Sequence, residues 1–392
     1  MRAAVGRVYW TRMSDRVVVV GNGVSGYACA ARLAEQGRPV TMIGPGLPHD
    51  RPPLSKRALV TGRVPLLADA AQLAERCIDH LDGVVTACNP GRRRLVVRRS
   101  SDCAEIELEA PILVWATGLR YPKPPVPGFE QAEENTTGPG LASLVRRLAV
   151  PQRRVIVVGA GLIGTETAAT LAASHDVTLV DMLDRPLARF LPSVSDAARS
   201  TLASLDVRFL GSCTIDSANI DARGAVVRTS THGDLHCDVV VSAAGYRSSL
   251  LPELAGPDPR ALTLPSDERL RVIGHERLWA CGDAVSFPHP RWGRIGIPHW
   301  DHALWSGRHA ADSILGSSAP YVREPYFFSD IGPLRIQQVG VADAAVGWHE
   351  EDGLVVGRDQ HGAPGCVLFL NAPERLREAR ELVASAAVVA VR

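Results

Sequence analysis

The sequence lacks several features that would assign it to a common class of protein. It has no run of about 18 apolar residues, so we expect no membrane-spanning helix. Its first fifteen residues lack the continuous apolar centre of a signal peptide. Basic and acidic residues nearly balance, at 43 and 42, so no net field attracts nucleic acid. Because 392 residues exceed one ordinary core, we expect two or three domains. We also expect a cytoplasmic protein.

Cysteine spacings typical of metal or redox sites are also missing. The eight cysteines form no CxxC or CxxxxC pair, which excludes the usual local zinc and iron–sulfur motifs and a redox-active disulfide. Scattered free thiols fit a reducing cytosol. His299, His302 and His309 have no cysteine or carboxylate partners in a ligand pattern, so no metal site is expected.

Lysine is nearly absent. Lys56 and Lys123 are the only two, although lysine and arginine together total 43. A compact ammonium and a planar guanidinium are not interchangeable, so a lysine that persists among arginines indicates a need for the ammonium. This argument selects Lys56, in "RPPLSKRALVTG". Lys123, in "YPKPP", is interpreted as a chance survivor.

One pattern is present twice. "RVVVVGNGVSG" begins at Arg16 and "RRVIVVGAGLIG" at Arg153, each followed by an alanine-rich amphipathic stretch. In G-x-G-x-x-G after a strand, the first glycine permits the tight turn. The second permits close approach of a pyrophosphate, and the third permits helix–strand packing. The helix N-terminus then offers free N–H groups to the phosphates. The two copies predict two dinucleotide sites, built on Gly21, Gly23 and Gly26 and on Gly159, Gly161 and Gly164.

The two copies differ where a sugar would be bound. Asp181 ends "VTLVD", 22 residues after Gly159, close to the spacing of a ribose-binding acid. A carboxylate there accepts from a free 2′-hydroxyl and repels a 2′-phosphate, which favours NADH, although the nearby Arg185 accommodates a phosphate. The first copy has Pro45 and Gly46 in this region and no acid, so its adenosine end must be held in another way.

Five segments in order extend the pattern: "DRPPLSK", "WATG", "GAGLIGTETAA", "ACGDAVSFP" and "PHWDHALWSGR". With them the chain resembles the FAD-dependent pyridine nucleotide-disulfide oxidoreductases, specifically the ferredoxin and rubredoxin reductase branch. The resemblance implies an α/β fold of two Rossmann-like dinucleotide-binding domains and a small α+β C-terminal domain. The implied FAD-binding domain is residues 1–118 and 243–318, with 1–14 disordered. The NAD-binding domain is then 119–242 and the C-terminal interface domain 319–392.

The resemblance also implies the cofactor contacts. Lys56 would lie beside the flavin, paired with Glu166, where its ammonium stabilises the anion formed on reduction. Trp300 would shield the flavin or carry electrons away from it. The implied NADH contacts are Gly159, Gly161, Leu162, Ile163, Gly164, Asp181 and Gly245. The implied FAD contacts are Gly21, Gly23, Val24, Ser25, Gly26, Arg51, Lys56, Ala116, Thr117, Gly118, Asp283, His299 and Trp300.

The implied reaction is hydride transfer from NADH to the flavin, followed by release of single electrons to a ferredoxin-type iron–sulfur protein. For docking of that partner, the "RRR" at 92–94 and Arg308 are candidates. Two alternatives stay open: a flavoprotein acting on a small molecule in a biosynthetic pathway, and a non-catalytic flavin redox sensor. Both a monomer and a homodimer are compatible with the sequence.

Overall fold

The computed structural model describes residues 15–255 and 261–385, so the tail predicted at 1–14 lies outside the described residues. Its contacts divide the chain into two units. Unit 1 contains the described residues up to Asp50, together with Leu66–Arg120 and Arg247–Tyr326. Unit 2 contains Arg51–Pro65, Tyr121–Tyr246 and the described residues from Phe327 onward. Within the described ranges, no helix is both long and apolar enough to cross a bilayer.

A parallel sheet forms the centre of unit 1. Its order, β17-β6-β1-β2-β3, places β1 and β6 side by side, with the chain winding outward from them in both directions. In such a sheet the crevice for a ligand opens at the carboxyl ends of the strands where the order reverses. These strands are β1 (Val17–Val20), β2 (Val40–Gly44), β3 (Ile78–Asn89), β6 (Ile112–Trp115) and β17 (Leu278–Ala280).

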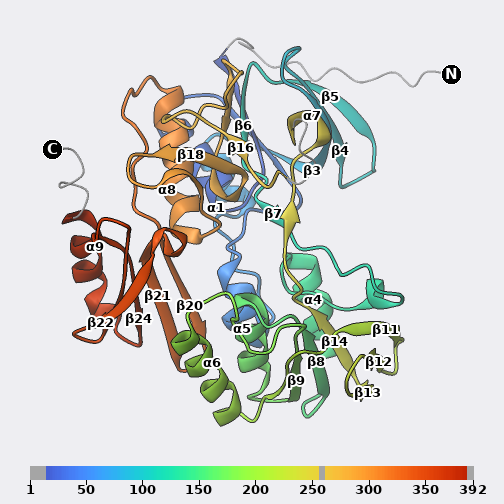
Figure 1. Cartoon of the computed structure of the whole chain (residues 1–392). Helices are drawn as coiled ribbons and strands as arrows, with labels where there is room; N and C mark the ends of the chain where they lie inside the picture. The colour runs from blue at the N-terminus through green and yellow to red at the C-terminus, as the bar shows by residue number, and fades with distance from the viewer. Residues whose placement is uncertain (1–14, 256–260, 386–392) are drawn as a thin grey trace. The chain divides into compact units, whose positions relative to one another are not determined.

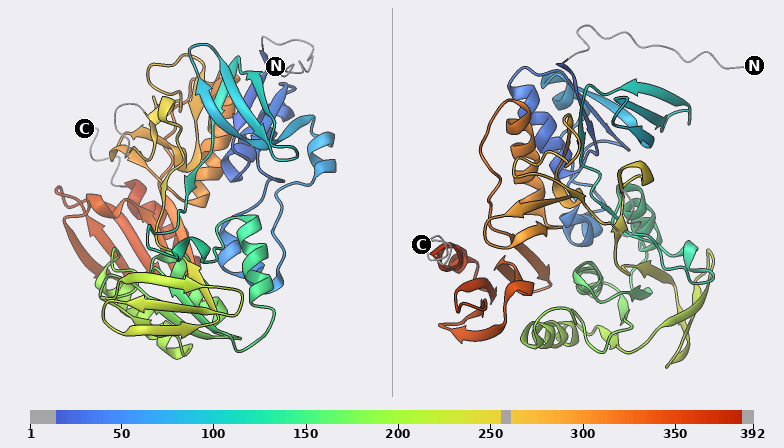
Figure 2. Two further views of the ribbon diagram at one scale, coloured as in Figure 1. Left: turned by 90° about the vertical axis from the view of Figure 1, so that its right-hand side faces the viewer. Right: turned by 45° about the horizontal axis from the view of Figure 1, so that its top comes forward.

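Strand β3 continues beyond this sheet into an antiparallel one. Its first half pairs in parallel with β2, and its second half pairs with β4, which pairs in turn with β5. Figure 2 shows this antiparallel part as the cyan strands. Its apolar face alternates with exposed charged residues, as expected for a sheet with one solvated side. The added strands are β4 (Arg94–Arg99) and β5 (Glu105–Glu109).

Helices α1 and α8 pack against each other in unit 1, as Figure 1 shows. Contact is close because Gly307 of α8 lies against the backbone of Ser25 in α1, where a Cβ would approach the Ser25 oxygen to 2.2 Å. The unit also contains two small sheets. Its remaining elements are α1 (Val24–Glu35), α3 (Ala70–Glu75), α7 (Pro252–Ala255), α8 (Trp300–Ile314), β7 (Leu119–Arg120), β15 (Arg247–Ser248), β16 (Leu264–Pro265), β18 (Val285–His289) and β19 (Gly293–Gly296).

Unit 2 repeats the parallel winding in a smaller sheet of order β10-β9-β8-β14. An antiparallel meander, β11-β12-β13, is attached to it. The elements are β8 (Arg154–Val158), β9 (Asp176–Val180), β10 (Arg208–Leu210), β11 (Ile215–Ile220), β12 (Ala225–Thr229), β13 (Gly233–Cys237), β14 (Val239–Ser242), α2 (Arg57–Thr61), α4 (Gly138–Arg147), α5 (Leu162–Leu171) and α6 (Pro192–Ser204).

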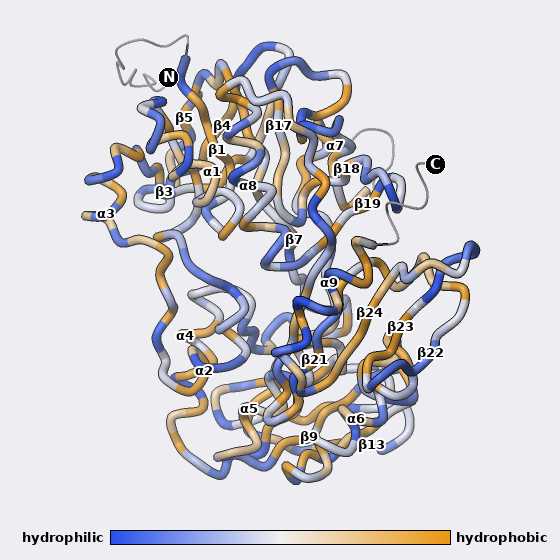
Figure 3. Tube along the Cα trace, turned by 90° about the vertical axis from the view of Figure 1, so that its left-hand side faces the viewer, coloured by the Kyte–Doolittle hydropathy of each residue, from blue (hydrophilic) through white to orange (hydrophobic). Residues whose placement is uncertain are grey.

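The C-terminal part of unit 2 is a five-stranded sheet with one covering helix, α9 (Leu376–Ser385). Its strand order is β20-β21-β24-β23-β22. Figure 3 shows the strands of the molecule as largely hydrophobic tube and the connections as largely hydrophilic. The five strands are β20 (Tyr326–Ile331), β21 (Leu334–Gly340), β22 (Gly347–Glu351), β23 (Leu354–Arg358) and β24 (Pro364–Leu370).

These elements confirm the predicted α/β fold with two Rossmann-like sheets and a small α+β C-terminal part. The predicted boundaries after residues 118 and 242 lie within a few residues of the changes of unit at Arg120 and Tyr246. The contacts differ from the prediction in two groupings. They join Arg51–Pro65, and also the segment after Phe327, to unit 2.

Candidate functional site: two dinucleotide turns

The first glycine of each turn is required by its backbone. Gly21 has φ +111° and Gly159 has φ +105°, conformations that other residues rarely adopt. A Cβ on Gly21 would lie 2.2 Å from the carbonyl oxygen of Ala116, which follows β6. A Cβ on Gly159 would lie 2.4 Å from the carbonyl oxygen of Ala243, which follows β14. Each turn therefore packs against the neighbouring strand end at the point where the strand order of its sheet reverses.

The third glycines close the turns from the inside. A Cβ on Gly26 would lie 1.9 Å from the Gly21 oxygen, and one on Gly164 would lie 1.7 Å from the Gly159 oxygen. No side chain fits at these positions, because the neighbouring atoms are rigid backbone. These two glycines therefore allow each helix to begin close to the end of the strand that precedes it.

The second glycines face open space. A Cβ on Gly23 or Gly161 would meet nothing within 4 Å, and neither residue has positive φ. The fold itself therefore does not require glycine there, whereas a pyrophosphate approaching the backbone would. Both residues are N-caps whose helices have no side-chain cap and no acidic residue in the first turn. The first N–H groups of α1 and α5 are thus left for a ligand.

The sugar ends of the turns differ in a way that the sequence did not reveal. In unit 2, Asp181 follows β9, and its carboxylate accepts hydrogen bonds from the backbone N–H groups of Ala160 and Leu183. In unit 1 the strand register places Gly44 at the equivalent position. Here the side chain of Asn22 occupies the space, because a Cβ on Gly44 would lie 2.4 Å from its Cγ.

Asn22 is itself fixed. It is 7% exposed, and its amide donates to the carbonyl of Gly46 at 2.7 Å and to that of Pro45 at 3.2 Å. Its side chain therefore fills the space that Gly44 leaves beside the first turn. In the sequence, the signal for Asn22 was its position between the first two glycines of the first motif, and it was not among the predicted site residues.

Helix α8 supports the Gly-Asp turn that follows β17. The N–H of Gly282, which has φ +66°, donates to Ser306 Oγ at 2.8 Å. A Cβ on Gly282 would collide with Ser25 Oγ in α1 at 2.5 Å. The turn before Asp283 is thus held by Ser306 of α8, and Ser25 of α1 leaves no room for a side chain at position 282. Ser306 and Gly307 were not predicted as site residues, and their small size on a helix face was the available signal.

The predicted pair of Lys56 and Glu166 is present in unit 2. Lys56 Nζ lies 3.0 Å from Glu166 Oε1 and 3.7 Å from Asp330 Oδ2. Glu166 is 7% exposed and accepts from Ser55 Oγ at 2.5 Å and Ser329 Oγ at 2.6 Å. A carboxylate held by two hydroxyls is rigid, so it fixes the direction of the lysine side chain. The Lys56 side chain remains 21% exposed.

The start of α8 contains Trp300 and His299 in unit 1. Trp300 Nε1 donates to Asp50 Oδ1 at 3.0 Å, which orients the indole. His299 is half-buried, and desolvation lowers its pKa to about 4. Desolvation also lowers the pKa of His302 to about 3, while its Nδ1 lies 3.0 Å from the Tyr321 hydroxyl. Both imidazoles are therefore neutral near pH 7.

Apart from Arg51 and Lys56, the remaining predicted residues lie in the unit that contains their motif. Thr117 and Gly118 are tied to one serine, because Ser249 Oγ lies 2.8 Å from Thr117 Oγ1 and donates to the Gly118 carbonyl. Arg51 and Lys56, predicted to contact FAD, belong to unit 2. The Arg51 guanidinium lies 4.7 Å from the centre of the Tyr121 ring. Val24 and Ser25 begin α1, Leu162 and Ile163 begin α5, and Gly245 has φ +89° with open space around its Cα.

The cysteines and histidines form no visible redox or metal centre. All eight cysteines are free, and six are buried. Burial raises the pKa of Cys281 to about 12, so this thiol stays protonated. In residues 15–255 and 261–385, no group of three or more potential ligands is gathered around one point.

Comparisons with known proteins agree with this geometry. The family model described as pyridine nucleotide-disulphide oxidoreductase matches residues 15–307. Rhodocoxin reductase from Rhodococcus erythropolis is 32% identical over 84% of this chain and 79% of its own length. Putidaredoxin reductase CamA from Pseudomonas putida is 29% identical over 84% of this chain and 81% of its own. The covalent putidaredoxin reductase–putidaredoxin complex superposes with a TM-score of 0.83 at 24% identity, covering 94% and 93% of the two chains.

The chain belongs to the pyridine nucleotide-disulphide oxidoreductase family. It is accordingly an oxidoreductase whose cofactors are FAD and a pyridine nucleotide. The described residues fit two such groups, because each turn leaves a space beside its second glycine and an uncapped helix N-terminus facing it. The family resemblance inferred from the sequence is confirmed.

Proposed function

We propose that the protein is an FAD-dependent reductase that passes electrons from NADH to a ferredoxin-type iron–sulfur protein of a monooxygenase or dioxygenase system. The relatives named as ferredoxin reductase components support this assignment, among them that of a chlorobenzene dioxygenase from Cupriavidus, 30% identical over 84% of this chain. FAD, when bound, supplies the conversion of a two-electron hydride donor into single electrons. The proposal includes a cytoplasmic location, in keeping with eight unpaired cysteines.

The observation that carries the proposal is the pair of matched turns in one chain. Gly23 and Gly161 each face open space in front of a helix N-terminus, although nothing in the fold requires glycine at either position. One turn would serve a protein with a single nucleotide. Two turns of this form suit an enzyme that binds a hydride donor and a flavin together. In this proposal unit 1 holds FAD and unit 2 holds NADH.

The role that we propose for Lys56 is electrostatic. Its ammonium is held by the buried carboxylate of Glu166, and a fixed positive charge stabilises negative charge that develops on a bound cofactor. Glu166 is a positioning residue in this scheme, since it acts through the lysine. Trp300, oriented by Asp50, is proposed to cover the flavin.

The preference for NADH rests on Asp181. Its two carboxylate oxygens are anchored by backbone N–H groups, so the negative charge stays at the end of β9. A 2′-phosphate at this point would meet a fixed carboxylate, whereas a free 2′-hydroxyl would donate to it.

For the iron–sulfur partner we favour the face of α8 over the arginines at 92–94. Arg308 lies there with its guanidinium 5.7 Å from the centre of the Trp305 ring, and the indole is 40% exposed. Arg323 lies on the same ring at 4.5 Å and is fixed by two hydrogen bonds to Asp301. Because an acidic ferredoxin would meet arginine and an exposed aromatic ring together, this surface suits docking.

The test uses the holoenzyme. The FAD-loaded protein is mixed with NADH in a stopped-flow spectrometer and then supplied with a ferredoxin and cytochrome c. We expect rapid bleaching of the flavin, slower bleaching with NADPH, and cytochrome reduction only when ferredoxin is present. Glu166→Gln should slow the bleaching at least tenfold, with FAD content unchanged, and Glu130→Gln, an exposed acid elsewhere in unit 2, should not.

Other outcomes would replace the proposal. Peroxide formation, or turnover of an organic acceptor without ferredoxin, would identify an enzyme that acts on a small molecule. A long-lived complex of NADH with the flavin, with no onward electron transfer, would identify a redox sensor. A protein that binds no FAD would contradict all three functions.

A further inference from the structure

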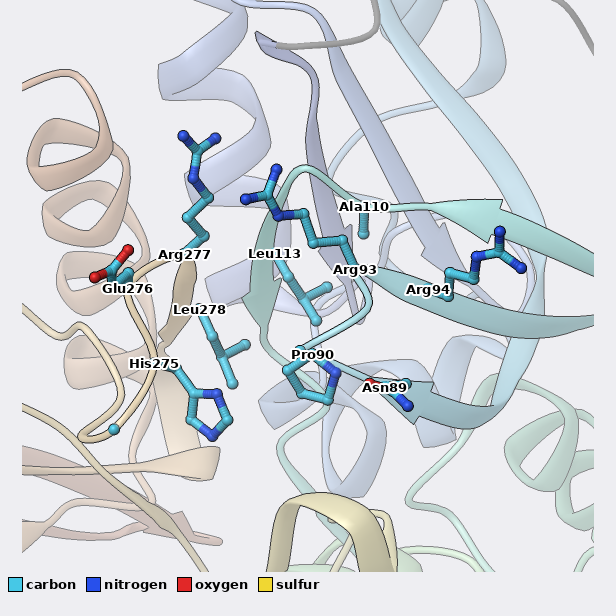
Figure 4. A pocket seen from close by; sticks show the side chains of 12 residues that line it. Asn89, Pro90, Arg93, Arg94, Ala110, Leu113, His275, Glu276, Arg277 and Leu278 are labelled. Carbon is cyan, nitrogen blue, oxygen red and sulfur yellow. The ribbon is translucent and has the colours of Figure 1, made fainter.

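A pocket of about 220 Å³ lies at the amino ends of strands in unit 1, and no function is assigned to it. Leu113 in β6 and Leu278 in β17 form part of its wall, together with the β3–β4 turn. Figure 4 shows this pocket and its side chains. Its charged lining residues are Arg93, Arg94, Glu276 and Arg277.

Backbone hydrogen bonds fix the two sides of this pocket. The carbonyl of Arg93 accepts from Ala110 N–H at 2.8 Å, and the carbonyl of Arg277 accepts from Leu113 N–H at 2.9 Å. Both arginines are thus attached to the same short segment, three residues apart. Their side chains start from opposite sides of the pocket, and Figure 4 shows the two guanidinium groups reaching the same side of it.

Two arginines of the β3–β4 hairpin, Arg94 and Arg99, are paired with carboxylates, whereas Arg93 and the neighbouring Arg277 are not. Arg94 lies 3.1 Å from Glu107, and in Figure 4 its side chain points away from the other two. Arg93 and Arg277 form no hydrogen bond or ion pair through their side chains with any residue that the structure describes. With Arg94 paired to Glu107, Arg93 and Arg277 still outnumber the one carboxylate among the lining residues, that of Glu276. The pocket is therefore electropositive.

The conformation of Arg93 adds a second observation. Its φ is +55°, in the left-handed region that asparagine and glycine occupy more readily than arginine does. Glycine adopts this conformation without the steric cost that arginine incurs there. The turn keeps this residue where its side chain lies beside a second unpaired guanidinium.

We propose that this pocket binds a small ligand with a dianionic phosphate-type group between Arg93 and Arg277. Guanidinium forks match the oxygens of phosphate in bidentate pairs, and two of them balance two negative charges. The floor of Ala110, Leu113 and Leu278 takes an apolar body of a few atoms. The volume admits a phosphate monoester and is too small for a dinucleotide, which needs several hundred Å³.

The pocket is separate from the nucleotide turn of its unit. Leu113 and Leu278 lie near the amino ends of strands whose carboxyl ends lead to Ala116 and Gly282. Three residues of strand span about 10 Å. A ligand here therefore does not compete with FAD for the Gly21 turn.

The test is titration of the FAD-saturated protein with inorganic phosphate by calorimetry, at constant ionic strength maintained with chloride. We expect saturable binding of one phosphate, weakened at least tenfold in the double variant Arg93→Gln/Arg277→Gln. The control is Arg92→Gln, which removes one positive charge from the same turn but does not line the pocket, and it is compared with the single variant Arg93→Gln, which removes one charge from within it. The affinity of Arg92→Gln should stay within twofold of the wild type.

Circular dichroism and FAD content verify that each variant is folded. Phosphate binding of equal strength in the wild type and the double variant would locate the anion elsewhere, such as at the open Gly161 turn, and would overturn the proposal. Absence of measurable binding to the wild type would overturn it as well. Equal weakening by Arg92→Gln would reduce the effect to general surface charge and likewise reject the pocket.

Discussion

The nucleotide turns of unit 1 and unit 2 have nearly the same backbone and differ in their side chains. Gly21 and Gly159 share a left-handed conformation, and Gly26 and Gly164 share a contact too close for any Cβ. At the sugar end, however, unit 2 has Ala160 and Asp181 where unit 1 has Asn22 and Gly44. The two turns thus share their backbone geometry, whereas the side chains at the proposed sugar ends differ.

The largest effect is expected at the third glycines. Gly26→Ala and Gly164→Ala each force a methyl group to within 2 Å of a carbonyl oxygen, so each should destabilise its own unit by more than about 3 kcal/mol. Gly26→Ala should abolish FAD binding. Gly164→Ala should leave the FAD of unit 1 in place and abolish its reduction by NADH. Urea unfolding and flavin absorbance measure both effects, and equal loss of FAD in the two variants would show that the turns are not independent.

The second-largest effect is expected at low pH, where unit 1 should lose stability because of two histidines. His299 and His302 in unit 1 have pKa values of about 4 and about 3, below the value of about 6.5 expected for an unfolded chain. The unfolded state then binds protons first, so stability is complete above pH 6.5 and is lost as the pH falls toward 4. At pH 5 we expect a loss of about 2 kcal/mol for each histidine.

Urea titrations at pH 7 and pH 5, followed by FAD release, measure this loss. His299→Gln removes one titrating group and should reduce the difference between the two pH values. The exposed His361→Gln is the matched control in unit 2. A wild-type pH dependence in His299→Gln would show that other titrating groups, and not this imidazole, cause the loss.

The second glycines distinguish a ligand site from a mere turn. A methyl group at Gly23 or Gly161 meets no atom of the protein, so Gly23→Ala and Gly161→Ala should leave the thermal midpoint without ligand nearly unchanged. Because the methyl group occupies the approach of the pyrophosphate, affinity for FAD in the first variant and for NADH in the second should fall about tenfold, or 1.4 kcal/mol. Unchanged affinities would mean that the nucleotides bind elsewhere.

The smallest effect is expected from exchanging the sugar ends. The double variant Asn22→Ala/Gly44→Asp gives unit 1 the pair found in unit 2 and should raise the affinity for FAD about threefold, the gain of about one exposed hydrogen bond. Gly44→Asp alone should lower it, because its Cβ would lie 2.4 Å from Asn22 Cγ. Equilibrium titration of the apoprotein with FAD measures both. Higher affinity in the single variant would show that Asn22 moves aside freely.

The sequence predicted the backbone part of this architecture well for a physical reason. A strand, a glycine spacing and a helix start are local, so "GNGVSG" and "GAGLIG" contain most of the information needed for the two turns. The α/β class was implied by the family resemblance that includes these two turns, and the structure has it; the strand order of the sheets was not predicted. The grouping of Arg51–Pro65 with unit 2 was not predicted either, because it depends on contacts such as that of Ser55 with Glu166, 111 residues away.

The predicted ion pair of Lys56 with Glu166 came from family resemblance, and no local pattern would have given it. Side chains that support a site through long-range packing were missed. Ser306 holds the Gly282 turn across 24 residues, and Asn22 fills a space that exists only because residue 44 has no side chain. Such roles require the three-dimensional neighbours of a residue, which periodicity and spacing do not contain.

The segment Arg51–Pro65 has a consequence for how the protein can be divided. The chain passes from one unit to the other at five points, so neither unit is an uninterrupted stretch of sequence. A gene fragment encoding 121–246 would contain the Gly159 turn without Lys56, and its product would lack the ammonium that Glu166 binds. Cassette exchange between homologues would therefore have to transplant residues 51–65 together with the nucleotide-binding half to keep this charge pair intact.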